Sequence, residues 1–109
     1  MRGEHVLEQR VDEMFNEAMT KVNQGDLEGA ASLLTIATTA IPRPEIYLEL
    51  CKIHMKKHSY DLVARYAKLG LEKCNHNMHK PLLVSELEKF AKSSSTAAVE
   101  VRKKVENFL

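Results

Sequence analysis

Cysteine and histidine side chains cluster in the second half of the chain, and their spacing is the first feature that could carry chemistry. Six of them fall within 29 residues, at Cys51, His54, His58, Cys74, His76 and His79. Zinc binds four such groups in a tetrahedron. His58 and His76, however, fall in predicted turns, so one tetrahedron is hard to assemble from these groups. We therefore expect no metal site, with packing as the role of Cys51 and His54 and a zinc protein as the alternative that a chelator would test.

Motifs for catalysis are lacking in the rest of the sequence. The chain has no glycine-rich phosphate loop, nucleophile elbow or His-Glu-x-x-His pattern, and its four glycines are too few for a nucleotide cradle. Glu86 and Glu88 are a carboxylate pair, but residues two apart on a helix point in different directions and cannot share a proton. The sequence therefore predicts a protein that is not an enzyme and needs no cofactor.

Length and charge limit the remaining classes. The 109 residues are 44% apolar, with a formal net charge of +1, which fits one domain spanning 1–109. A near-neutral chain lacks the basic stripe of a nucleic-acid binder, and we interpret 102–104 as an exposed helix face. The longest apolar stretch, 30–41, is too short to span a bilayer. Charges near the amino terminus do not suit an export signal, so we expect a cytoplasmic protein with reduced cysteines.

Hydrophobic residues recur with a period of about 3.6 in six stretches, so the fold class is predicted to be all-α. Loops are expected at 23–25, 42–44, 57–58, 75–80 and 93–95. Asp26, Ser59 and Thr96 stand where N-caps belong, and Pro44 and Pro81 suit the first position of a helix. These signals separate about six helices.

An internal repeat with a spacing of 33 residues links the first two pairs of predicted helices. The pairs that share this offset are Ala18 and Cys51, Leu27 and Tyr60, Ala30 and Val63, Leu34 and Ala67, and Ala37 and Gly70. Small residues thus recur where two helices must touch.

This pattern resembles the tetratricopeptide repeat, a helix-turn-helix unit of about 34 residues. With repeat one starting at Val11, the signature sites are filled by Ala18, Ala30, Ala37 and Pro42, and the turn by Gly25 and Asp26. With repeat two starting at Pro44, they are filled by Tyr47, Leu50, Cys51, His54 and Tyr60. The resemblance implies a right-handed superhelix of three hairpins, at about 11–43, 44–77 and 78–109. The third is degenerate, with Ser85 and Ala97 as its small sites.

The resemblance also implies a concave groove lined by the first helix of each repeat. The groove residues that it predicts are Phe15, Met19, Val22, Leu48, Lys52, Met55, Lys56 and Leu82. Phe15 and Met19 occupy the sites where chaperone-binding members of the family carry Lys and Asn to hold a carboxylate tail, so that binding mode is rejected. An apolar wall with lysines suits an amphipathic helix or peptide of a partner protein. The alternative is that these apolar residues belong to the core.

Two hypotheses for the function follow from this groove. The first is a chaperone or adaptor that shields a segment of a partner protein, similar in size and layout to the small repeat chaperones of bacterial type III secretion. The second is a structural module that buries the same groove in a homodimer. The molecular mass in solution distinguishes a monomer awaiting a partner from a tight dimer.

Overall fold

Five helices and no strands make up the part of the chain that the computed structural model describes, which is residues 2–74 and 81–93. The helices are α1 (Arg2–Asn23), α2 (Leu27–Ala40), α3 (Pro44–Lys56), α4 (Tyr60–Lys73) and a fifth at residues 81–93. The all-α prediction is confirmed for these residues. The predicted loop at 75–80 and the predicted last helix, with Thr96 and Ala97, lie outside them.

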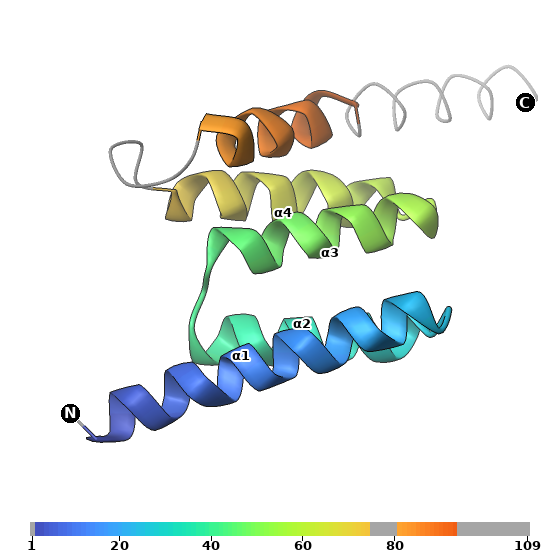
Figure 1. The fold of residues 1–109 in the computed structure, drawn as a ribbon. Helices are drawn as coiled ribbons and strands as arrows, with labels where there is room; N and C mark the ends of the chain where they lie inside the picture. The colour runs from blue at the N-terminus through green and yellow to red at the C-terminus, as the bar shows by residue number, and fades with distance from the viewer. Residues whose placement is uncertain (1, 75–80, 94–109) are drawn as a thin grey trace, which may run out of the picture.

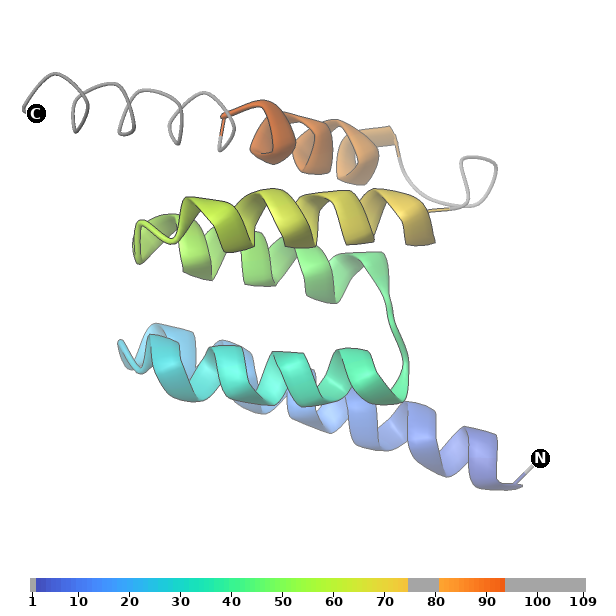
Figure 2. The same cartoon turned by 180° about the vertical axis from the view of Figure 1, so that it is seen from behind.

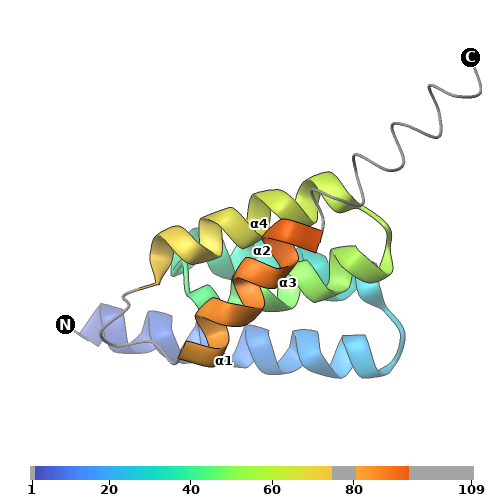
Figure 3. The same cartoon turned by 90° about the horizontal axis from the view of Figure 1, so that it is seen from above.

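Consecutive helices run in opposite directions and stack as layers. The hairpin of α1 and α2 lies below the hairpin of α3 and α4, and the helix at 81–93 lies above them (Figure 1). α1 and α3 are on the near side in Figure 1, while α2 and α4 are on the near side in the reverse view (Figure 2). Seen from above, the helix at 81–93 crosses the pair of α3 and α4 (Figure 3). The first helices of the two hairpins therefore form one side of the molecule.

The two hairpin turns have the same hydrogen-bond geometry. Gly25 and His58 both adopt left-handed backbone conformations, with φ of +83° and +59°. In the first turn the Asp26 N–H donates to the Lys21 carbonyl at 2.8 Å. In the second turn the Ser59 N–H donates to the His54 carbonyl at 2.9 Å. This is the Schellman end of an α-helix. The two left-handed residues are 33 positions apart, which is the spacing of the sequence repeat.

Helix starts agree with the signals in the sequence. The Asp26 carboxylate accepts a hydrogen bond from the Gly29 N–H at 2.9 Å and caps α2. Pro44 lies in the first turn of α3, and Pro81 is the first residue of the fifth helix. Ser59 is the N-cap residue of α4 but makes no capping hydrogen bond through its side chain.

Two hydrophobic clusters hold the layers together. The first joins α1, α2 and α3, where small residues are completely buried among larger ones such as Leu34 and Leu50. Its small residues include Ala18, Ala30 and Ala37. Without side chains beyond Cβ, these positions let the helix backbones approach closely, so the predicted contact sites of repeat one are where helices touch.

The second cluster attaches the fifth helix. Leu87 is fully buried with Leu48, Cys51, Val63 and Ala67, and burial of one leucine stabilises a fold by about 2 kcal/mol. Gly70 makes room for this contact, because a Cβ there would lie 3.0 Å from a Leu87 methyl carbon and 3.0 Å from the Tyr47 Cβ.

The predicted small site of repeat three is wrong. Ser85 is exposed, and the residue that packs on α4 is Leu87, two positions later. Two positions on a helix are about 200° apart, so Ser85 lies on the face away from this contact.

The turns provide a test of the repeated geometry. Gly25→Ala should lower the free energy of unfolding by about 1 kcal/mol, because a side chain is strained in the left-handed region. His58→Gly at the equivalent position should raise it by up to about 1 kcal/mol, because it removes that strain. Urea denaturation measures both. If both variants changed the free energy of unfolding in the same direction, the two turns would not be equivalent.

Candidate functional site

Three depressions open on the side formed by α1, α3 and the fifth helix. Their volumes are about 400, 350 and 290 Å³. The first is lined by Asp12, Phe15, Asn16, Arg43, Glu45 and Ile46. The second is lined by Val22, Glu49, Lys52, Ile53, Met55, Lys56 and Phe90, and the third by Lys52, Met55, Glu86, Lys89, Phe90 and Ser93. We call these lining residues the groove face.

The groove face has an apolar floor, which we define as Phe15, Val22, Met55 and Phe90. Each of these side chains is half-buried, with Phe15 and Val22 packed on the first core cluster and Met55 and Phe90 on the second. The core therefore holds one side of each residue in place. The other side faces the depressions.

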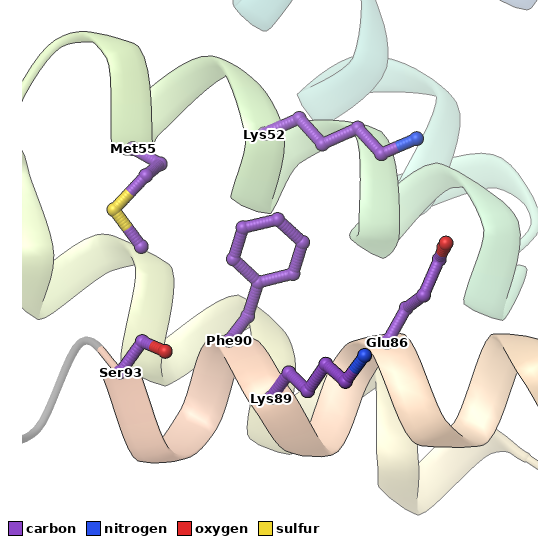
Figure 4. A pocket seen from close by; sticks show the side chains of 6 residues that line it. All are labelled: Lys52, Met55, Glu86, Lys89, Phe90 and Ser93. Atoms are coloured by element: carbon purple, nitrogen blue, oxygen red, sulfur yellow. The ribbon is translucent and has the colours of Figure 1, made fainter.

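Phe90 lies at the centre of the third depression. Its ring points from the fifth helix toward α3, between the side chains of Met55 and Lys52 (Figure 4). Ser93 lies one turn further along the same helix, near the Met55 end (Figure 4). The contact between α3 and the fifth helix thus leaves an aromatic ring as part of the wall.

Charged side chains surround this floor. Lys52 forms an ion pair with Glu49 on the same helix, with 3.3 Å between the ammonium nitrogen and a carboxylate oxygen. At the other end, Arg43 pairs with Asp12 and ties the α2–α3 loop to α1, with 2.5 Å between the paired atoms. Within residues 2–74 and 81–93, Lys56 and Lys89 have no ion-pair partner. Exposed pairs of this kind add little stability and can exchange partners.

Five of the eight predicted groove residues line the depressions. These are Phe15, Val22, Lys52, Met55 and Lys56. Met19 is half-buried on α1 against the first cluster but lines none of the three depressions. Leu82 is 68% exposed on the fifth helix and also lies outside them.

Leu48 is a core residue, in contrast to its predicted place on the open wall. It is only 7% exposed and packs in the second cluster with Leu87. The fifth helix covers this part of α3, so that the side chain expected to face a ligand faces another helix instead. Met55, two turns later on α3, keeps one side open.

Sequence reasoning missed Phe90, which lines two of the three depressions. The available signal was the repeat itself, because Phe90 is residue 13 from the predicted start of repeat three at 78, as Lys56 is residue 13 from the start of repeat two at Pro44.

The cysteines and histidines of the described residues lie in separate surroundings. The buried Cys51 thiol donates to the Val63 carbonyl, at 3.5 Å between sulfur and oxygen, and burial raises its pKa to about 12. His58 Nδ1 shares a hydrogen bond with the Tyr60 hydroxyl at 2.9 Å on the surface. In residues 2–74 and 81–93 no three His, Cys, Asp or Glu side chains are placed to hold a metal. His76 and His79, the other histidines of the cluster, lie outside these residues.

His54 is buried behind the groove face, at the junction of α2, α3 and α4. Its ring stacks on Tyr66, with centroids 5.5 Å apart, and its Nδ1 has no hydrogen-bond partner in the described structure. Burial lowers the pKa of His54, the positive charge of Lys57 lowers it further, and Glu28 of α2 opposes these effects. The ring therefore favours the neutral form.

The comparisons with known proteins add no relative. No family model, curated protein or solved structure matches the chain. Among the described helices, none combines the length and the apolar character needed to cross a membrane. Function must therefore be inferred from the groove face.

The buried histidine predicts an acid-dependent loss of stability. A folded-state pKa below the ordinary value of 6.5 means that the unfolded chain binds the proton more tightly. The stability from neutral His54 is then complete above about pH 6.5 and decreases as the pH falls toward the folded-state pKa. Chemical denaturation between pH 7.5 and 5.5 should show this decrease in the wild type and a smaller one in His54→Phe. His58→Gln, which changes an exposed histidine, is the control. An unchanged slope in His54→Phe would contradict the assignment.

Proposed function

We propose that the chain is a non-enzymatic protein-binding module of the tetratricopeptide-repeat type, which acts as a chaperone or adaptor. Its hairpins stack as a right-handed superhelix, and the groove face is the concave wall. The ligand is an amphipathic helix or extended segment of a partner protein. One observation carries this proposal: the apolar floor is fixed by the core on one side and open on the other, with charges around it.

The repeat assignment is supported by positions that the sequence pattern singled out. Ala18, Ala30 and Cys51 have no exposed surface. The turns at Gly25 and His58 share one geometry at the repeat spacing. The buried small residues let the backbones of neighbouring helices approach closely, and the turns reverse the direction of the chain. Both features define a stacked helical hairpin.

The shape of the groove face favours a polypeptide over a small molecule. Small-molecule sites are usually a single enclosed cavity. Here three open depressions follow one another across α1, α3 and the fifth helix, and two of them share lining residues. An amphipathic segment can place successive apolar side chains in such a series. Met55 adds a flexible side chain that adapts to different partners.

A chaperone role follows from what such a face would cover. A partner segment with a matching apolar stripe is prone to aggregate when alone, and burial in the groove would shield it. The resemblance in size and layout to small type III secretion chaperones suggests an export substrate as the partner. Cys51 and Cys74 are free thiols, which suits a reducing compartment, so we place this activity in the cytoplasm.

The groove face can be tested with substitutions that change polarity without adding charge. The double variant Val22→Gln with Met55→Gln should reduce capture of the native partner at least tenfold. The reason is that two polar amides replace apolar side chains of the floor that a ligand would contact. Helical circular dichroism should be retained, since both residues are half-buried. Pull-down from the native source followed by an affinity measurement with the purified partner gives the result.

Two further variants complete this experiment. Ile36→Gln changes an exposed apolar residue of α2, away from the three depressions, and should leave capture intact. Leu48→Asp should unfold the protein, because it places a charge in the second cluster. Loss of capture in Ile36→Gln but not in the groove variant would contradict the proposal. A tight dimer in light scattering, broken by the groove variant, would favour self-association.

A further inference from the structure

The second and third depressions form one continuous site around Phe90. They share Lys52, Met55 and Phe90 as lining residues. The Phe90 ring lies between the other two side chains, so that an apolar centre is bounded by a lysine on one side (Figure 4). We call this combined site the anchor site. Its combined volume of several hundred Å³ accommodates a large apolar side chain with part of the adjoining backbone.

The charges around the anchor site have an excess of positive sign. Its lining includes Lys52, Lys56 and Lys89, against the carboxylates of Glu49 and Glu86. Glu49 is already paired with Lys52. Glu86 alone therefore opposes the two lysines that have no ion-pair partner among the described residues.

The depression at the other end has the opposite excess. Arg43 is paired with Asp12, and Glu45 adds a second carboxylate without a second cation. The sign of the charge thus changes along the groove face, from negative between α1 and the start of α3 to positive at the anchor site. A ligand with uniform charge would be repelled at one end.

We infer that the anchor site takes a large apolar side chain, such as leucine or phenylalanine, from a partner segment whose residues beside that side chain are acidic. The apolar side chain contacts Met55 and Phe90, and its acidic neighbours pair with Lys56 and Lys89. This inference rests on the proposed function, because it names the kind of segment that the groove face binds. Exposed ion pairs contribute only a few-fold in affinity each, so charge sets the preference while the apolar contact supplies most of the binding.

Two synthetic helical peptides test this inference. Both carry two leucines four residues apart, and the residues flanking them are glutamate in the acidic probe and lysine in the basic probe. Fluorescence anisotropy at low salt should show the acidic probe binding about 3- to 30-fold more tightly than the basic probe. The difference should shrink in 0.5 M NaCl because salt screens exposed charges.

Charge-reversal variants locate the preference. Lys56→Glu with Lys89→Glu should invert it, while Lys68→Glu with Lys73→Glu, which reverses two exposed lysines of α4, should leave it in place. A preference that survives the first pair, or is lost equally in the second, would overturn the inference.

The failure of this inference is distinguishable from failure of the proposed function. If both peptides bind equally and Val22→Gln with Met55→Gln weakens both, the groove face binds protein without the acidic preference. If neither peptide binds and the groove variant still captures the native partner, both the anchor site and the proposed function are wrong.

Discussion

Close approach of helices through small side chains is the constraint on which this structure depends. Ala18, Ala30 and Ala37 allow α1, α2 and α3 to pack around one cluster, and Gly70 lets the fifth helix reach α4 and α3 through Leu87. A larger residue at these sites would move the layers apart. The separation of the layers in turn decides which apolar side chains are enclosed and which stay at the surface.

The groove face is a consequence of that division. The second cluster takes up Leu48 completely but only one side of Met55 and Phe90, because the fifth helix crosses α3 rather than covering its whole length (Figure 3). On α1, the same holds for Phe15 and Val22 above the first cluster. The core therefore holds the floor rigidly while leaving it exposed, which lowers the entropy lost when a ligand binds.

The sequence predicted those parts of the fold that depend on local signals. The caps and prolines at Asp26, Pro44 and Pro81 marked helix starts correctly, because they satisfy backbone groups within one turn. It failed where one helix had to be placed on another. Leu48 was assigned to the groove because periodicity along α3 does not show which part of α3 another helix covers, and the fifth helix covers Leu48 through Leu87. Phe90 was missed although its place in the third repeat matches that of Lys56 in the second.

The account requires that Met55 be exposed to solvent in the free protein and covered by a ligand, while Leu87 is enclosed in both states. Methyl NMR with a water-soluble paramagnetic agent measures this directly. We expect strong broadening of the Met55 methyl signal in the free protein, protection after the partner is added, and no broadening of the Leu87 methyls in either state. A Met55 methyl as protected as those of Leu87 in the free protein would show that the groove face is closed and would contradict the account.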